Sequence, residues 1–180
     1  MSDVLAIAEH RRGELRDVSF ELITAGAEVA EAAGGELHVA IIGGDVEGFA
    51  EDLNREGVDV VHAAANGEEF NHDVYVQTVE ALVDDVGPEY LLLPNSVNGL
   101  DYAPALAIDR NMPLVTDVVE LEVDGEDLVA MREMYGSKVE TAIEVAEGPY
   151  AITIRSAEWP PAEGMGEAEV SAERLRSANV

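Results

Sequence analysis

Short apolar runs alternate with helical patterns over the first half of the chain, and this alternation constrains the fold more than any other feature. The runs cover residues 4–8, 37–42, 58–61 and 90–93. They do not alternate with polar residues, which is typical of strands buried on both faces. Strands that alternate with helices form a parallel sheet with right-handed crossovers and helices on both sides. The sequence therefore predicts an α/β fold, a three-layer sandwich with a mostly parallel sheet.

Local signals mark the ends of the helices between these strands. A short polar side chain before a helix can accept a hydrogen bond from the first free backbone N–H groups, and glycine ends helices well because it tolerates a left-handed backbone. The candidate N-caps are Asp17, Asp45 and either Asn71 or Asp73. The glycines expected after these three helices are Gly34-Gly35, Gly57 and Gly87.

Beyond Asp117 the pattern changes to alternating apolar and polar residues. The alternation continues to residue 145 around two turn signals, Asp124-Gly125 and Gly136, so it predicts antiparallel strands. The stretch "PYAITIR", residues 149–155, is interpreted as one more strand of this set. We expect these antiparallel strands to extend one edge of the parallel sheet.

The rest of the chain is interpreted as a separate segment. Residues 156–170 are rich in Pro, Gly and Glu, which is typical of an exposed linker, and we expect this linker to point away from the core. The predicted division is an α/β domain over residues 1–155 and an acidic Pro/Gly linker and tail over residues 156–180.

Acidic residues outnumber basic ones, and this excludes some classes of partner. The chain has 38 Asp and Glu against 10 Lys and Arg, a formal net charge of -28 at pH 7. Nucleic acids and anionic membranes repel such a charge, so neither is expected as a partner. Dispersed carboxylates predict a halophilic surface, whose self-repulsion a high-salt cytosol screens. With no cysteine, signal peptide or long apolar run, the sequence predicts a cytoplasmic protein without direct membrane insertion.

Familiar cofactor and metal fingerprints are missing from the sequence. No G-x-G-x-x-G and no Walker loop follows a predicted strand, so the usual backbone cradle for a pyrophosphate is missing. No two histidines have the spacing of metal ligands, and no metal site is predicted. The four histidines are His10, His38, His62 and His72.

The loop after the strand at residues 90–93 is the best candidate for a binding site. Its sequence, "LLLPNSVNGLDYAPALA", places Asn95, Ser96 and Asn98 at the carboxyl end of a central strand, where open α/β sheets bind ligands. Asp101 stands where a helix N-cap is expected. The alternative is structural, with Asp101 capping the helix and the polar residues satisfying loop backbone. A further alternative is a hydrolase in which His10 and Asp101 activate Ser96 as the nucleophile, but the sequence has no nucleophile elbow around Ser96.

A second polar set lies in the antiparallel region and has cationic members. Arg132, Tyr135 and Lys138 surround Gly136 and interrupt the acidic trend. Such residues are typical of a solvated turn. They can also meet the carboxylates of a protein partner, which makes them a candidate interface.

Several stretches resemble the N-terminal domain of the electron-transfer flavoprotein alpha subunit in a haloarchaeal-like form. They include "VLAIAEHRRGELRDVSFELITAGAEVA", "NSVNGLDYAPALAI", "PLVTDVVELE", "MREMYGSKVETAI" and "YAITIRSAEWPPAE". The landmarks that carry the resemblance are Glu9-His10, the helix start at Gly99 to Pro104, the pair Thr116-Asp117 and the turn from Arg132 to Lys138. One departure is Leu100, because family members usually have arginine there.

The resemblance implies a fold, a partner and a cofactor. The fold would be adenine nucleotide alpha-hydrolase-like, and the domain would pack against a beta subunit through a pseudo-twofold relation. FAD would belong to the parent complex, bound mainly by a second domain that this chain lacks, so the chain is interpreted as a fragment or a short paralogue. By resemblance, the loop with Asn95, Ser96, Asn98 and Asp101 corresponds to the beta subunit's AMP pocket and is vestigial.

The predicted role is therefore that of an electron carrier subunit or scaffold with no catalytic residues of its own. It would support electron transfer from acyl-CoA-type or other dehydrogenases toward a quinone reductase, with the chemistry supplied by FAD. We expect no FAD on this chain alone, because a phosphate would meet the carboxylate of Asp101 at the only suitable helix start. The alternative is a stand-alone nucleotide-binding module similar to a universal stress protein, which would require a glycine-rich phosphate loop.

The charge of the chain leads to a prediction about salt. If the surface is halophilic, the melting temperature should rise steeply between about 0.1 and 2 M KCl, because screening relieves like-charge repulsion. Differential scanning calorimetry over this range tests it. A flat or falling melting temperature would contradict the halophilic interpretation.

Overall fold

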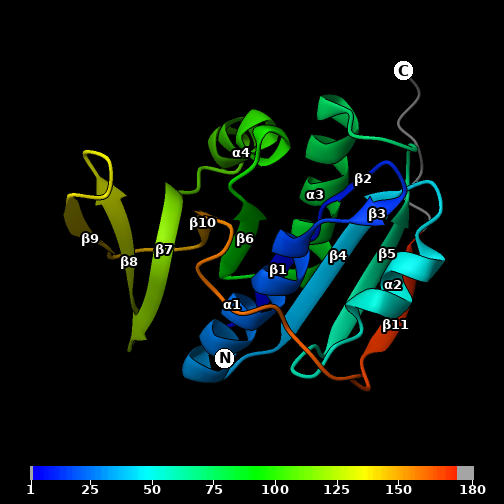
Figure 1. Ribbon diagram of the computed structural model, residues 1–180, viewed down its shortest axis with the longest axis horizontal. Helices are drawn as coiled ribbons and strands as arrows, with labels where there is room; N and C mark the ends of the chain where they lie inside the picture. The colour runs from blue at the N-terminus through cyan, green and yellow to red at the C-terminus, as the bar shows by residue number, and fades with distance from the viewer. Residues whose placement is uncertain (1, 174–180) are drawn as a thin grey trace.

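A nine-stranded sheet runs through the structure, a computed structural model that describes residues 2–173 (Figure 1). The strand order is β11-β5-β4-β1-β6-β10-β7-β8-β9. The strands are β1 (Val4–Ile7), β4 (Leu37–Gly43), β5 (Val60–Ala65), β6 (Tyr90–Pro94), β7 (Leu114–Asp124), β8 (Asp127–Met134), β9 (Val139–Val145), β10 (Tyr150–Ile154) and β11 (Glu169–Glu173). A small separate hairpin after β1 consists of β2 (His10–Arg11) and β3 (Glu14–Leu15).

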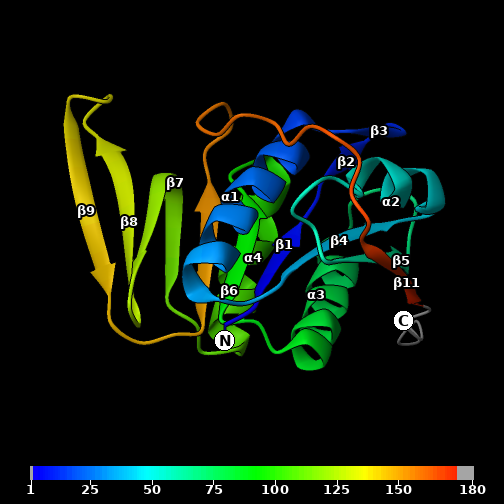
Figure 2. The same ribbon diagram turned by 90° about the horizontal axis from the view of Figure 1, so that it is seen from below.

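Helices cover both faces of the parallel strands, as the alternation predicts. The helices are α1 (Asp17–Ala33), α2 (Glu47–Leu53), α3 (His72–Val86) and α4 (Val97–Asp109). The buried side chains fall into two clusters, one shared with α1 and α2 and the other with α3 and α4. Figure 2 shows α1 and α3 on opposite sides of β1. The predicted three-layer α/β sandwich is confirmed.

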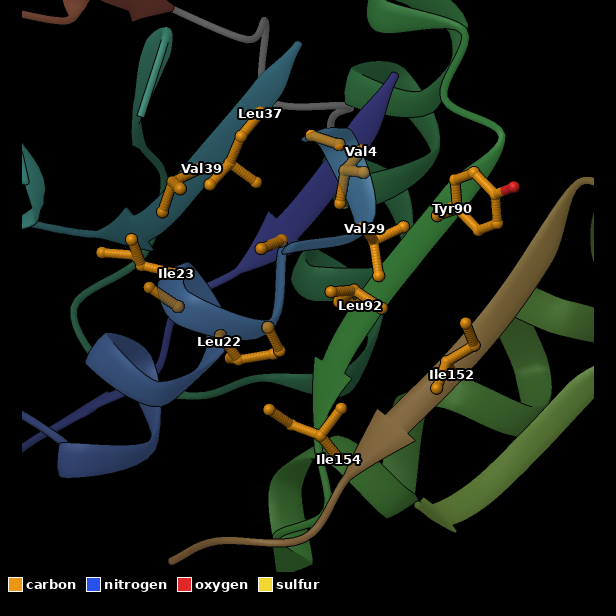
Figure 3. Close-up of a cluster of buried hydrophobic side chains, with 14 of the residues drawn as sticks. Val4, Leu22, Ile23, Val29, Leu37, Val39, Tyr90, Leu92, Ile152 and Ile154 are labelled. Carbon is orange, nitrogen blue, oxygen red and sulfur yellow. The ribbon is translucent and has the colours of Figure 1, made fainter. Parts of the chain in front are cut away.

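The core under α1 joins the first strands of the chain to a strand near its end. Figure 3 shows Leu22 and Val29 of α1 among side chains of β4, β1, β6 and β10. Val4, Leu22 and Ile152 are completely buried. Each such aliphatic side chain contributes about 1.5–3 kcal/mol when it is fully buried, so this cluster is a large part of the driving force for folding.

Several predicted helix ends are confirmed and three are wrong. Gly34 ends α1 in a left-handed conformation, and the Asn71 side chain caps α3 by accepting from the Val74 backbone N–H. Asp17 does not cap α1, because Arg16 occupies the N-cap position and Asp17 is the first helical residue. Asp45 does not cap α2, whose N-cap is Val46 with no side-chain hydrogen bond. Helix α2 also ends at Leu53, with Asn54 as its C-cap, and not at Gly57. Each helix still has an acidic residue in its first turn, Asp17 in α1 and Glu47 in α2, whose negative charge stabilises the positive end of the helix dipole.

The strand β10 is not antiparallel and does not lie at an edge, so that part of the prediction is wrong. It runs parallel to β6 on one side and to β7 on the other, with all five residues buried. The antiparallel extension consists only of β8 and β9, beyond β7. A strand in the middle of a three-layer sandwich is covered by helices on both faces, and this explains why "YAITI" shows no alternation.

The strand β7 changes direction at Asp117. Before this residue β7 runs parallel to β10, with Leu114 opposite Ala151. Beyond Asp117 the chain runs back toward the level at which β10 begins. There the hydroxyl group of Tyr150, the first residue of β10, donates to the backbone oxygen of Glu126, which follows β7. Asp117 has a φ of 57°, a left-handed conformation that few residues other than glycine adopt. The returning half of β7 pairs with β8 and begins the antiparallel extension.

Residues 156–168 do not point away from the core, contrary to the expectation for a linker. They cross the outer side of α1, where the Trp159 side chain is buried and the backbone N–H of Ala162 donates to the Phe20 backbone oxygen. Asn54 then binds the chain through the backbone N–H of Ala168. We call residues 156–168 the strap. It leads to β11, which adds a parallel strand beside β5, while the division of domains at residue 155 stays a prediction.

No helix in residues 2–173 is long and apolar enough to cross a membrane.

Candidate functional site

The carboxyl ends of β1 and β6 border a cleft at the point where the chain changes sides of the sheet. From β1 the chain continues to β4 on one side, whereas from β6 it leads through α4 to β7 on the other. In open α/β sheets ligands bind at such points. The cleft has a volume of about 300 Å³ and is lined by residues that include Glu9, Arg11, Ser96 and Asn98. A neighbouring hollow of about 560 Å³ shares Glu9 and Ser96 with it.

Two of the predicted pocket residues, Ser96 and Asn98, line this cleft, and Ser96 also has a structural role. Its side chain is the N-cap of α4 and accepts from the Gly99 backbone N–H at 3.0 Å. Its hydroxyl group donates to the Glu9 Oε1 at 2.6 Å. Asn98 contributes to the lining of the same cleft.

Gly99 fixes how closely α4 approaches β6. A Cβ atom at this position would lie 1.9 Å from the backbone oxygen of Pro94. Only glycine allows this approach, which places the first turn of α4 directly above the end of β6. The glycine of the predicted helix start is therefore a packing requirement.

Asp101 does not cap α4 and does not line the cleft, so its predicted position is wrong. Ser96 caps the helix one turn earlier, and Asp101 lies inside α4 on the surface. Its carboxylate contacts the Nδ1 atom of His72 on α3 at 3.0 Å. The prediction failed because "NSVNGLD" contains two possible caps, Ser96 and Asp101. The first turn of the helix exposes the apolar residues Val97 and Leu100, so it lacks the usual pattern of polar residues on the exposed face.

Glu9 is a buried carboxylate that the sequence did not predict as a site residue, since it appeared only in the Glu9-His10 landmark of the family. Its side chain accepts from Ser96, and its backbone exchanges two hydrogen bonds with the Ser19 hydroxyl group. The Glu9 backbone oxygen also accepts from the Arg16 backbone N–H. Arg11 and Arg16 line the cleft and are exposed. The cleft thus combines a negative group at its base with cations at its rim.

The hydrolase interpretation finds no support in these contacts. Ser96 donates to Glu9 instead of His10, and His10 contacts the Ile42 backbone oxygen through Nε2 at 2.7 Å. Asp101 is paired with His72. The three residues of the hypothesis therefore all have other partners.

A polar network lies beside the cleft, where β6, β7, β8 and β10 meet. Arg155 directly follows β10, and its Nε and Nη2 atoms donate to the two carboxylate oxygens of Asp117, both at 2.9 Å. Its Nη1 atom donates to Glu133 on β8 at 2.6 Å. The Asn95 amide donates to Asp117 at 3.2 Å, and the Thr153 hydroxyl group donates to Asn95. Asn95 is thus held in this network, although it also lines the neighbouring hollow.

The network shifts the pKa values of its carboxylates. The hydrogen bond from Arg155, more than its charge, holds the pKa of Asp117 below the ordinary value of 3.8. The pKa of Glu133 is lowered by hydrogen bonds from Ser137 and then from Arg155. The hydrogen bonds to Asp117 and Glu133 raise the pKa of Arg155. All three groups are charged at neutral pH.

The predicted cationic set lies away from the cleft, around the turn between β8 and β9. The side chains of Tyr135 and Lys138 are exposed, and Tyr135 is 77% accessible to solvent. Arg132 lies on β8 and is half-buried, and within residues 2–173 its Nε atom has no hydrogen-bond partner. Their role as an interface stays a prediction.

The structure also pairs two histidines that the sequence left apart. His38 Nδ1 and His62 Nε2 lie 2.9 Å apart on neighbouring strands. Burial, and then His62, lower the pKa of His38. In residues 2–173 no group of three His, Asp or Glu side chains could hold a metal ion.

Comparison with known proteins identifies a family profile and relatives. The profile described as "Electron transfer flavoprotein domain" matches residues 4–179. The electron transfer flavoprotein subunit alpha of Methylophilus methylotrophus is 38% identical over 173 residues, 95% of this chain and 54% of that protein.

Two further relatives have the same name. The alpha subunit of Clostridium acetobutylicum is 34% identical over 157 residues, 84% of this chain and 47% of that protein. The alpha subunit of Bacillus subtilis is 30% identical over 137 residues, 75% of this chain and 42% of that protein. The chain thus spans about half the length of the relatives it matches.

The network leads to a prediction for Asp117→Asn. The variant should lose about 1–2 kcal/mol of unfolding free energy at pH 7, because a charge-assisted pair that is partly screened by solvent is broken. The folded pKa of Asp117 is depressed, so its stabilisation is complete above the unfolded pKa and is lost as the pH falls through the folded pKa. The difference between wild type and variant should therefore shrink as the pH falls below 3.8.

Urea unfolding from about pH 7 down to about pH 2.5 measures this difference. The control is Glu120→Gln, an exposed carboxylate on the same strand, which should change stability little at any pH. A difference that stays constant over the whole pH range would contradict the assigned role of Asp117.

Proposed function

Because the chain belongs to the electron transfer flavoprotein family, we propose that it is an alpha-type subunit or the N-terminal scaffold domain of one. In this role it pairs with a beta-type subunit and supports FAD-dependent electron transfer from dehydrogenases, of the acyl-CoA type or others, toward a quinone reductase. The observation that carries the proposal is the family match over nearly the whole chain. The family match does not favour the alternative of a stand-alone nucleotide-binding module.

The chain's own residues do not fit FAD. The two phosphates of the dinucleotide require several backbone donors, usually from a glycine-rich turn at a helix N-terminus. At the start of α4 the Gly99 N–H is already bound by Ser96, and the carboxylate of Glu9 lies beside it. A phosphate there would be repelled, although Arg11 and Arg16 stand at the rim. FAD, when bound in the complex, supplies the electron-transfer chemistry, and this domain serves as a scaffold without catalytic residues.

The cleft with Ser96 and Asn98, together with the neighbouring hollow that Asn95 lines, is accordingly proposed to be a vestigial nucleotide pocket. Asn95 is occupied by Asp117 and Thr153, and Ser96 by Glu9 and Gly99. Polar groups that satisfy one another inside the domain are not free for a ligand. Asp101 is no longer included, because it faces His72.

The hairpin of β8 and β9 is the proposed place of contact with the beta-type subunit. Arg132, Tyr135 and Lys138 lie on it, and its tip also exposes Met134 and Val139. Cationic groups on so acidic a protein can pair with carboxylates of a partner and fix its orientation. We further propose a halophilic, cytoplasmic protein whose domain covers residues 1–155, with the strap and β11 packed against it in the structure.

Association with the beta-type subunit tests the function. Mixed with the beta-type subunit of the same organism, the chain should form a 1:1 complex, measured by analytical ultracentrifugation. Reversal of charge at Arg132 and Lys138 together should weaken binding on the order of tenfold or more. The control is Arg11→Glu with Arg12→Glu, an equal change of charge on the exposed β2–β3 hairpin.

The outcomes separate two statements. If the wild-type chain forms no complex, the proposed function fails. If the complex forms and the Arg132 and Lys138 variant binds as the control does, the hairpin is not an electrostatic contact.

Binding of flavin tests the scaffold role. The purified chain alone should be colourless and leave the fluorescence of FAD unquenched at tens of micromolar, because the donors for two phosphates are missing. Fluorescence titration and the absorption spectrum after gel filtration measure this. A yellow preparation with stoichiometric flavin would contradict the proposal and indicate a rebuilt pocket near Asn95, Ser96 and Asn98.

A further inference from the structure

An apolar stripe runs along the outer side of α4. Val97, Leu100 and Ile108 are 87%, 42% and 78% exposed, and they are three of the eight large hydrophobic side chains exposed in residues 2–173. Together with the exposed Pro104 they recur three or four residues apart, so they lie on one face of the helix. We call these four residues the α4 stripe. Single exposed hydrophobic residues are common, but a continuous stripe usually marks a site of interaction.

The rest of α4 is already in contact with the domain. Tyr102, Ala103 and Leu106 are completely or almost completely buried. Toward α3 the helix is fixed by the contact between Asp101 and His72. The stripe therefore makes no contribution to the core, and its exposure is not explained by packing inside this chain.

The stripe continues into an apolar groove at the end of α4. This groove has a volume of about 610 Å³, and its lining includes Pro104, Ile108, Met112 and Leu114. Leu114 is the first residue of β7, the strand that leads into the β8–β9 hairpin. In Figures 1 and 2, α4 lies between α3 and β7, on the way to that hairpin. The stripe and the groove together offer a surface that is long enough for a protein partner.

Charge decides which protein fits this surface. Asp101 and Asp109 flank the stripe on α4, and both are exposed. In a twofold dimer the same patch is used by both copies, so these carboxylates would approach carboxylates of the other copy, in a chain with a net charge of -28. A second copy is thus a poor occupant. A subunit with apolar side chains ringed by Lys or Arg satisfies both the stripe and its acidic border.

We propose that the α4 stripe, with its adjoining groove, is the apolar centre of the contact with the partner subunit. This inference rests on the proposed function, because it takes the partner to be the beta-type subunit. It adds a contact that the Arg132, Tyr135 and Lys138 set does not contain, on a different element of the fold.

The test replaces the stripe without adding charge. In Leu100→Gln with Ile108→Gln, the affinity for the beta-type subunit of the same organism should fall on the order of 10- to 1000-fold, because the complex loses two buried aliphatic side chains. Isothermal titration calorimetry measures it. The matched control is Met165→Gln with Val170→Gln, two exposed apolar residues on the strap and on β11. This control should bind within about twofold of the wild type.

A second variant tests the acidic border. Asp109→Lys should weaken binding most at low ionic strength, since it places a cation opposite the expected Lys or Arg residues. Tighter binding of Asp109→Lys would overturn the inferred chemistry of the partner. Melting temperatures close to the wild-type value show that both variants are folded, as expected for exposed positions.

The other outcomes are distinct. If the wild-type chain does not bind the beta-type subunit, the proposed function and this inference both fail. If it binds and the Leu100 and Ile108 variant binds equally well, only the inference is overturned. If the chain forms a homodimer that the variant dissociates, the stripe is a contact between copies and the proposed occupant is wrong.

Discussion

The ion pair between Arg155 and Asp117 holds together the part of the molecule on which the remaining architecture depends. At Asp117 the strand β7 changes direction with a positive φ, and directly after β10 Arg155 begins the passage into the strap. Glu133 on β8 accepts from the same guanidinium group, and the Asn95 amide at the end of β6 donates to Asp117. A left-handed aspartate costs conformational energy, which a bidentate charge-assisted pair can offset. Arg155 thereby links the end of β10 to β7 and β8.

The cleft lies where open α/β sheets bind ligands, but Ser96 and Glu9 in its lining are already bonded to each other. Gly99 brings α4 close to the end of β6, and the cleft opens at the place where this type of sheet binds ligands. At its base, however, the Ser96 hydroxyl group accepts from the Gly99 backbone N–H and donates to Glu9. The same contacts that stabilise the helix start make it a poor receptor for a phosphate. This is consistent with a scaffold role for the domain.

The surface divides along the sheet. At one edge β11 pairs with β5, and at the other the β8–β9 hairpin extends beyond the helices. The α4 stripe and the tip of this hairpin account for six of the eight exposed large hydrophobic side chains in residues 2–173. Because the chain is strongly acidic, long-range charge disfavours contact between copies and favours a basic partner. Apolar contact can then supply affinity where charge supplies selection.

The sequence by itself determined the layers and many of the boundaries. Continuous apolar runs predicted buried parallel strands, and the Asn71 cap and Gly34 marked helix ends, because these signals depend on neighbouring residues only. Only the tertiary structure decided which strand lies beside which. The run "YAITI" indicated burial but not its place between β6 and β7, since periodicity reports how a strand is covered and not its hydrogen-bonding neighbours. For the same reason the site differed from expectation. The partners of Ser96 and Arg155 are Glu9, 87 residues away, and Asp117, 38 residues away, and contacts so distant along the chain leave no local pattern.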